Sequence, residues 1–542
     1  MAATIVFIAR RIVTLNPSIP CATHVAVRDG RILGVGGPEV RDAFGPASVD
    51  DRFAARVLLP GFVEGHGHAG AGQIWARPYV GFFDRTDPDG QVWCGIKSIP
   101  ELVGRLKELQ AKLPDADAPL LAWGFDPIYF GGPRLGRADL DSVSATRPVI
   151  VGHISGHIIN VNTPVLDAAG FSRDSNLDGL LRDAGGDLTG ELLGPAVMNR
   201  AARVVPTWRD LRAYDVPGLR AFASMARRVG VTTSTDLVNP LTPDGEAALR
   251  AATGADDYPL RLVPALSQRE YATEAGVARL QALRGTSTDK LRFGLVKLVL
   301  DGSIQGFSAR LRWPGYHNGA PNGLFYIAPD ELEGILGAYH RGGAVIHVHT
   351  NGDEASELAI ETFERVLAAH PRPDHRHTLQ HGQMIDAPLF RRMRVLGMCA
   401  NLFANHVYYW GDQHAAVTMG PSRAQRLDAC GTALREGVPL AIHSDAPVTP
   451  LAPLFTAQCA AARRTPSGAL LGADERISVA DAIRAITLGP AYTLKLDNLV
   501  GSIDVGKFAD FAVLETDPHE VAAEELADIP VHGTILGGRA TA

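Results

Sequence analysis

Leu58-Leu59-Pro60-Gly61-Phe62-Val63-Glu64-Gly65-His66-Gly67-His68 is an apolar run that leads directly into two histidines spaced two residues apart. Side chains on an extended strand alternate between its two faces, so both imidazoles would leave the same face. Imidazole is the commonest side-chain ligand of zinc and neighbouring metals. The pair therefore predicts part of a metal site, although a polar strand end would give the same pattern.

Seven further buried runs follow, separated by segments long enough for helices. They span residues 230–237, 260–266, 291–301, 344–350, 376–381, 398–403 and 439–445, and residues 56–66 supply the first of the series. Buried strands that alternate with helices are typical of α/β proteins, and a series of this length predicts a (β/α)8 TIM barrel. In such a barrel, catalytic residues lie at the carboxyl ends of the strands.

The two ends of the chain share another pattern. Residues 1–56 alternate short β-type runs with turns, and the same pattern returns at 501–514 and 533–539. We expect residues 1–56 and 497–542 to form one composite β-sandwich domain, with the barrel at 57–496.

After the first barrel strand, the sequence predicts an insertion at about 70–217. It is rich in aromatic residues, and one helical pattern runs from Ile99 to Leu113. The insertion is expected to be either an accessory domain with its own core or a lid over an apolar pocket.

Composition narrows the class of partner. The chain has 542 residues, 46% hydrophobic and 20% charged, and a net charge of -7. These values predict a folded protein without the basic field that nucleic acid or an anionic membrane would need, so a small-molecule substrate is expected. Five scattered cysteines predict no disulfide framework. Because neither a signal peptide nor a membrane-spanning segment is evident, a cytoplasmic location is expected.

Metal-binding residue types stand at the ends of several predicted strands. The set comprises His66, His68, Lys297, His349, His381 and Asp445. Taken singly, each histidine could be a core residue and Asp445 a turn residue. Together they have the composition of a two-metal centre.

Lys297 interrupts the apolar run Leu295-Val296-Lys297-Leu298-Val299-Leu300, where an unpaired ammonium would be costly to bury. One interpretation is an ion pair with a carboxylate such as Asp301. The other is a carboxylated lysine, because desolvation favours the neutral amine that combines with carbon dioxide.

These motifs resemble the amidohydrolase superfamily, in the family 3 branch that includes N-substituted formamide deformylase and related uncharacterised metal-dependent hydrolases. The resemblance covers nearly the whole chain, through residues 60–68, 156–162, 296–303, 349–353, 380–383, 408–412, 443–450 and 501–510. It implies a distorted barrel with a binuclear centre, and a homodimer as the assembly. One departure is Glu64, where an aspartate is more usual, and little consequence is expected of it.

The resemblance also implies how the ligands are shared. His66 and His68 would hold one divalent ion and His349 and His381 the other, with carboxylated Lys297 bridging them. Asp445 would bind the first ion and act as the base. Zinc is the first expectation for such ligands, while manganese, iron and cobalt are compatible with them.

The expected reaction is hydrolysis of a non-peptide C–N bond, in an amide or N-acyl group of a small apolar or aromatic substrate. An N-substituted formamide is one candidate. A hydroxide bridging the metals would attack the carbonyl, and Asp445 would pass the proton to the leaving nitrogen. Candidate substrate contacts are His157, His406, Trp410, Phe83 and Asp353. The alternatives are a deaminase or cyclic amide or imine hydrolase, and, more remotely, a non-catalytic barrel scaffold.

Overall fold

A parallel sheet of eight strands forms the centre of the computed structural model, which describes residues 3–541 except 114, 116–117, 133 and 206–213. The strands follow the order β19-β18-β17-β16-β15-β14-β13-β5. They are β5 (Phe62–Glu64), β13 (Val231–Asn239), β14 (Arg261–Ser267), β15 (Leu295–Val299), β16 (Val345–Thr350), β17 (Thr378–His381), β18 (Cys399–Leu402) and β19 (Leu440–Ile442). The predicted series of strands and their sequential order are confirmed.

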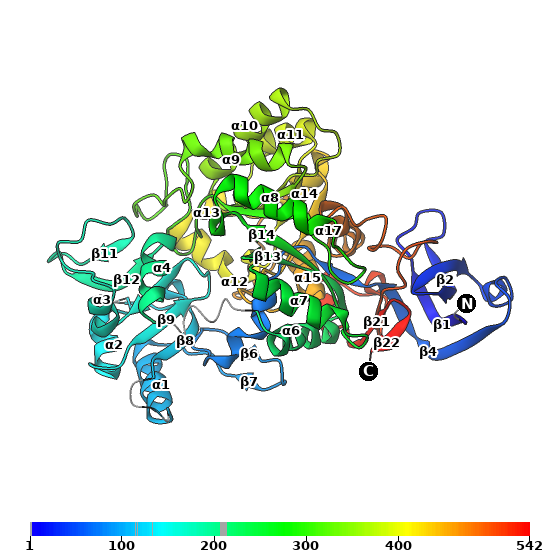
Figure 1. Ribbon diagram of the computed structural model, residues 1–542, viewed down its shortest axis with the longest axis horizontal. Helices are drawn as coiled ribbons and strands as arrows, with labels where there is room; N and C mark the ends of the chain where they lie inside the picture. Colours follow the sequence, from blue (N-terminus) through cyan, green and yellow to red (C-terminus); the bar gives the residue numbers. More distant parts are fainter. Residues whose placement is uncertain (1–2, 114, 116–117, 133, 206–213, 542) are drawn as a thin grey trace.

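Helices connect these strands and cover the outer face of the sheet (Figure 1). They include α6 (Val216–Arg228), α7 (Pro243–Gly254), α8 (Thr273–Arg284), α9 (Pro329–Arg341), α10 (Asp353–Ala369), α11 (Ala387–Leu396), α14 (Cys430–Arg435), α15 (Pro453–Ala462), α16 (Val479–Ala485) and α17 (Leu488–Thr493). Their apolar sides and the outward-facing strand residues share one large buried cluster. The alternation of strand and helix gives the mixed α/β architecture that the sequence predicts.

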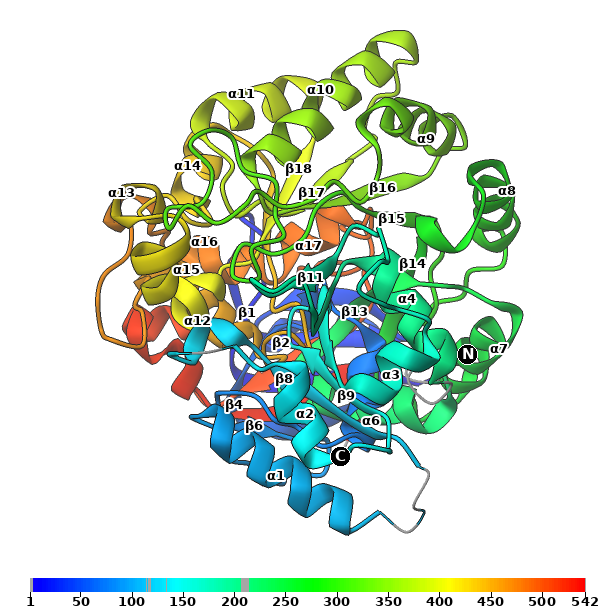
Figure 2. The same cartoon turned by 90° about the vertical axis from the view of Figure 1, so that its left-hand side faces the viewer.

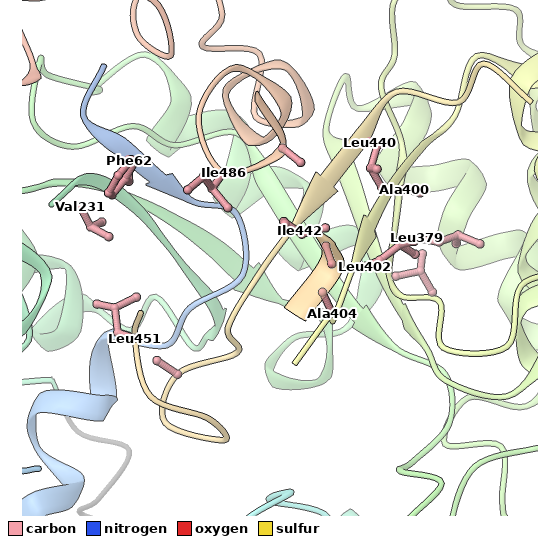
Figure 3. Close-up of a cluster of buried hydrophobic side chains, with 14 of the residues drawn as sticks. Phe62, Val231, Leu379, Ala400, Leu402, Ala404, Leu440, Ile442, Leu451 and Ile486 are labelled. Atoms are coloured by element: carbon pink, nitrogen blue, oxygen red, sulfur yellow. The ribbon is translucent and has the colours of Figure 1, made fainter. Parts of the chain in front are cut away.

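The sheet curls, but its hydrogen-bonded ladder stops at β19 and β5 within the described part of the chain. At this seam the Val63 amide donates to the Ile486 carbonyl at 2.9 Å. Figure 3 shows Ile486 between β5, which bears Phe62, and β19, which bears Ile442. The segment between α16 and α17 therefore occupies the position where a closed barrel would pair its first and last strands.

The interior of the curled sheet changes character along the strands. An apolar cluster contains Val63, Val263, Ala265, Leu295 and Val345. Further along the strands, Lys297 pairs in register with His347, and Gln380 pairs with Asn401. Side chains alternate along a strand, so polar groups two residues after the apolar ones reach the same interior at its carboxyl end.

The N- and C-terminal segments together build one sheet of seven strands, in the order β22-β21-β20-β4-β1-β2-β3. These are β1 (Thr4–Val13), β2 (Cys21–Arg28), β3 (Arg31–Gly36), β4 (Ala47–Pro60), β20 (Phe511–Leu514), β21 (Val531–Leu536) and β22 (Arg539–Thr541). The expected joining of both ends is thus present in a single sheet, and the two-layer sandwich stays a prediction.

Strand β4 crosses the predicted domain boundary at residue 56 without interruption. Leu58 belongs to the apolar cluster of the seven-stranded sheet, whereas Val57 and Leu59 belong to the cluster of the central sheet. Because successive side chains face opposite ways, one strand contributes to both cores.

Between β5 and β13 the chain forms a five-stranded sheet, ordered β11-β12-β10-β9-β8, and a two-stranded sheet. Its elements are β6 (Arg85–Thr86), β7 (Val92–Trp93), α1 (Ile99–Ala111), β8 (Leu120–Phe125), α2 (Arg137–Val143), β9 (Val149–His153), β10 (Ile158–Val161), α3 (Thr163–Ala168), β11 (Leu180–Arg182), β12 (Leu188–Leu193) and α4 (Pro195–Val204). The helix expected over Ile99–Leu113 is confirmed as α1. Part of the predicted insertion, residues 206–213, lies outside the described residues.

The insertion has buried clusters of its own and lies on the opposite side of the central sheet from the seven-stranded sheet (Figure 1). Viewed from its own side, it stands in front of the central strands (Figure 2). It also shares an aromatic cluster with α12 (His406–Gln413), in which Tyr79 and Trp123 join Phe403, Tyr409 and Trp410. The accessory core is therefore present, and a lid motion stays a prediction.

All five cysteines are free thiols, as the sequence predicts. No helix in the described part of the chain is long and apolar enough to cross a membrane.

Candidate metal centre

The predicted ligands converge at the carboxyl ends of the central strands. One oxygen of Asp445, Oδ1, lies 3.0 Å from His68 Nε2 and 3.3 Å from His66 Nε2. Lys297 Nζ is 3.4 Å from His66 Nε2. The His381 ring lies 4.5 Å from that of His66 and 4.3 Å from that of His349, centroid to centroid. Six donors from five separate stretches of the sequence thus surround one small volume.

Hydrogen bonds on the far side of each ring fix which nitrogen His66 and His68 present. His66 Nδ1 lies 2.7 Å from Gln380 Oε1, and His68 Nδ1 lies 2.6 Å from the Leu237 carbonyl. Because both partners are acceptors, each Nδ1 carries a proton and each Nε2 faces the centre. The Gln380 amide also donates to His347 Nδ1, so the polar interior of the sheet orients the first ligand.

Strand β13 holds the loop that bears the two histidines. Thr235 Oγ1 accepts from the Gly67 amide at 3.0 Å, and Asp236 Oδ1 accepts from the Ala69 amide at 2.9 Å. Both side chains are fully buried. Sequence reasoning missed this role, although the run Thr232-Thr233-Ser234-Thr235-Asp236 inside a buried strand was an available signal.

Glu64 lies outside the ligand set, as expected, but it has a structural role that the sequence interpretation underestimated. Its carboxylate accepts from the His66 amide at 3.0 Å and from Ser444 Oγ at 2.6 Å. Burial raises the pKa of Glu64 to about 7, against the lowering effect of these hydrogen bonds. The carboxyl group therefore joins β5 to the segment after β19, across the seam of the sheet.

Lys297 makes no ion pair within the described residues, which argues against its pairing with Asp301. The Asp301 carboxylate instead accepts from the backbone amides of Arg310, Asn351 and Gly352. Burial lowers the pKa of Lys297 to about 7 and raises that of Asp301 to about 7. A substantial share of the lysine is therefore the neutral amine at neutral pH.

The second histidine pair also fits a cation. His349 Nε2 lies 3.1 Å from the Gly302 carbonyl, so this nitrogen donates and Nδ1 remains an acceptor. Both ring nitrogens of His381 are buried, and neither has a hydrogen-bond partner among the described residues. A buried polar nitrogen without a partner is costly, and a divalent ion would satisfy it. The residues present thus fit the divalent ions that the sequence implies.

The backbone is strained where two of these ligands meet. His381 has φ 67° and Asp445 has φ 52°, both in the left-handed region that non-glycine residues rarely adopt. Such conformations persist where the surrounding structure enforces them and are common at functional sites.

Sequence reasoning missed one further imidazole, that of His443. Its side chain is buried, and its ring stacks on that of His66 at 4.4 Å and 20°. His66, His381 and His443 form one potential ligand group, and His66, His68 and Asp445 form another. The signal was available, because His443 precedes Asp445 by the same two-residue spacing as His66 precedes His68.

Two predicted substrate contacts lie close to this centre. The His157 ring is 5.1 Å from that of His349, and burial lowers the pKa of His157 to about 3. The His406 ring packs 4.2 Å from Phe403, whose ring in turn stacks on His443 at 4.8 Å. His406 Nδ1 is 3.3 Å from the buried Asp428 carboxylate.

The other three candidates occupy different settings. Phe83 is half-buried and meets the Tyr409 ring edge-on at 4.9 Å, within the aromatic cluster. Trp410 is buried, and its Nε1 donates to Asp126 Oδ2 at 2.9 Å. Asp353 accepts from the Arg312 amide at 2.9 Å, at the start of α10. The structure thus gives Trp410 and Asp353 internal hydrogen bonds.

Comparison with known proteins places this centre in context. A model described as the amidohydrolase family matches residues 55–542. The protein YtcJ of Bacillus subtilis (strain 168) is 28% identical over 533 residues, which cover 95% of each chain. N-substituted formamide deformylase of Arthrobacter pascens is 24% identical over 549 residues, which cover 97% of this chain and 96% of the deformylase.

Among solved structures, an uncharacterised metal-dependent hydrolase from Pyrococcus horikoshii OT3 superimposes with a TM-score of 0.71. The two are 17% identical in sequence, and the match covers 96% of this chain and 99% of that one. This likeness shows a shared fold.

Proposed function

The chain belongs to the amidohydrolase family, enzymes that act on carbon–nitrogen bonds, and from this premise we propose that it hydrolyses a non-peptide amide or N-acyl bond. The proposed substrate is small, with an apolar or aromatic substituent, and the proposed centre holds two divalent ions, zinc first. The observation that carries the proposal is the convergence of His66, His68 and Asp445 with His381, whose two buried ring nitrogens have no hydrogen-bond partner in the described part of the chain.

The proposed ligand atoms follow from the hydrogen bonds that these side chains already make. His66 and His68 present Nε2, and His349 presents Nδ1, because their other nitrogens are engaged. Lys297, as a carbamate formed from its neutral amine and carbon dioxide with release of a proton, would supply two oxygens that share one negative charge to hold the ions. When bound, the ions would polarise the substrate carbonyl and lower the pKa of a water molecule.

Asp445 is the group proposed to move the proton. Its Oδ1 is 3.0 Å from His68 Nε2, so the carboxylate oxygen and the proposed ligand nitrogen lie at the same point of the centre. It would accept a proton from the attacking water and return it to the departing nitrogen. The ring of His157 contacts those of His349 and Tyr326 and would face the substrate.

The aromatic cluster supports an apolar substituent on the substrate. Phe83, Tyr129 and Tyr409 bring the insertion against α12, near the His406 side of the centre. The relative named as a formamide deformylase supports an amide-like bond, with N-substituted formamides among the first compounds to test.

The test pairs metal content with turnover on one preparation. Elemental analysis should find about two divalent ions per chain, and chelation should abolish hydrolysis that added zinc restores. The panel should contain N-substituted formamides, longer N-acyl amines, carbamates and cyclic imides. Amine plus acid as products would support the proposal, whereas released ammonia or a ring-opened acid would point to deamination or ring opening. Failure of metal-loaded protein on the whole panel would refute it.

A further inference from the structure

His443 occupies the interior of the sheet at the level of the predicted ligands. It directly follows β19, and its amide donates to the Leu402 carbonyl at 3.1 Å, which extends the ladder with β18 by one residue. Its ring lies between two others, nearly parallel to His66 on one side and to Phe403 on the other. The position of His443 is therefore set by the backbone and by both neighbours.

Neither ring nitrogen of His443 has a hydrogen-bond partner in the described structure, although the residue is 1% exposed. Buried histidines away from the centre differ. His153 Nε2 lies 2.6 Å from Asn160 Oδ1, and His414 reaches both Gln383 and Thr418. A buried imidazole with two unpartnered nitrogens is costly, so the position is explained best if a ligand satisfies at least one of them.

The neighbours of His443 indicate the chemistry of that ligand. Its available nitrogen lies within 4.8 Å of nitrogens of His66 and His381, and His66 belongs also to the group with His68 and Asp445. His66 has only Nε2 to offer, because Gln380 engages Nδ1. The two donor groups therefore share His66 Nε2, and their other members lie around the same centre.

We propose that His443 is a further metal ligand of this chain, which donates a ring nitrogen to a divalent ion held together with His66 and His381. The inference rests on the proposed metal centre, adds a donor that the expected set of six residues does not contain, and places His66 and His381 on one ion where the resemblance implies two. A third imidazole on this side would favour borderline metals such as zinc or cobalt over magnesium, which prefers oxygen ligands.

The decisive variant is His443→Phe, which keeps a flat ring between His66 and Phe403 but removes both nitrogens. Phe403→Leu is the matched control, because it removes one stacking partner and leaves every nitrogen in place. Cobalt(II) is the probe, and the readouts are its affinity for chelated protein and its visible absorption spectrum. Circular dichroism and a melting curve of each metal-free protein establish that it is folded.

If His443 is a ligand, His443→Phe should weaken cobalt binding by more than about 100-fold, beyond the effect typical of residues that only support a ligand. Any cobalt still bound should show a shifted spectrum, while Phe403→Leu keeps the wild-type spectrum. Should His443→Phe fail to fold, His443→Asn provides the same comparison with a smaller side chain.

An unchanged affinity and spectrum in folded His443→Phe would overturn the inference and leave the rest of the centre intact. Failure of the wild-type protein to bind cobalt would instead refute the proposed metal centre itself. The two failures are thus distinguishable without any substrate.

Discussion

At the scale of single residues, Asp445 is expected to matter for chemistry more than for folding. Asp445→Asn keeps the size of the side chain but removes the proton acceptor, so kcat should fall by about 10²- to 10⁴-fold. The melting temperature of the metal-loaded variant should stay close to that of wild type. Steady-state kinetics with the best panel substrate would measure this, and near-normal turnover would exclude Asp445 as the base.

Lys297 offers a second test, in which an added carboxylic acid can replace the carboxylated side chain. Lys297→Ala should retain fewer ions per chain than wild type and lose activity, because the bridging oxygens are gone. A short carboxylic acid such as acetate would fit the vacated space and should restore part of the metal content and part of the activity. Elemental analysis with and without acetate measures the effect. Wild-type metal content in the variant would show that Lys297 does not bridge.

The sequence could identify most of this centre, because its ligands are rare residue types at the ends of apolar runs. His66 and His68 were recognisable from their spacing, and Lys297 from its apolar neighbours. His443 lies in the same motif as Asp445, but a histidine at a strand end has several explanations. Only the three-dimensional contact with His66 and the unpartnered nitrogens separate these explanations.

At the scale of elements, the junction between the insertion and α12 depends on a buried hydrogen bond. Trp410 Nε1 donates to Asp126 Oδ2, and burial raises the pKa of Asp126 to about 6 despite this bond. Trp410→Phe keeps the apolar ring but leaves a buried oxygen unpartnered, so the free energy of unfolding should fall by about 1–3 kcal/mol.

The same variant separates a structural role of Trp410 from a substrate contact. If the structural assignment holds, kcat should remain near the wild-type value while stability falls in a urea titration. Tyr408→Phe, on the same helix but half-buried, is a suitable control. A large rise in KM without loss of stability would restore Trp410 as a substrate contact.

A second element-scale prediction concerns three histidines where α9 meets the start of β17. His377 Nδ1 accepts from the Ile346 amide, and its Nε2 lies 2.9 Å from His340 Nδ1. His375 Nδ1 accepts from the His377 amide. These contacts need neutral rings, and burial lowers the pKa of all three histidines.

The sign of the pH dependence follows from those shifts. Below the unfolded-state pKa of about 6.5, the unfolded chain binds more protons than the folded one, so acid favours unfolding. Between pH 7.5 and 5.5 the cluster should cost up to about 1.4 kcal/mol for each histidine. Urea titrations of chelated protein would measure this, because acid also displaces metals. His340→Phe should reduce the dependence, and an identical dependence in this variant would contradict the assignment.

Strand positions were predictable, whereas the seam of the sheet was not. Apolar runs such as the one before His349 are short, buried and separated by helical patterns, which identifies strands directly. Ile486, by contrast, lies in a segment with an ordinary helical pattern, and nothing in it indicates a backbone bond to Val63. The closing contact depends on tertiary packing, which no local pattern records.

At the scale of the whole molecule, one buried ion pair joins the central sheet to the C-terminal strands. Arg261 on β14 contacts Asp510 through Nε at 2.6 Å and Nη2 at 3.0 Å, and both side chains are almost fully buried. Asp510→Ala would leave a buried guanidinium without its partner, at a cost of about 3–5 kcal/mol.

The matched control is the exposed pair Arg220–Asp257, which has similar two-point geometry at 2.9 and 3.0 Å. Its side chains are 43% and 71% exposed, so Asp257→Ala should cost less than about 1 kcal/mol. Equal losses in the two variants, measured by urea unfolding, would mean that burial does not govern the strength of the Arg261–Asp510 contact.

Strand β4 contributes to two cores but pairs with a strand near the other end of the chain, so neither sheet can be completed early in synthesis. Its partner β20 leaves the ribosome roughly 450 residues later, which corresponds to about 20 to 90 seconds of translation. Throughout that interval the edge of β4 that β20 will cover has no strand beside it, and such edges promote aggregation. A nascent chain of this protein should therefore depend on chaperones until its last strands emerge.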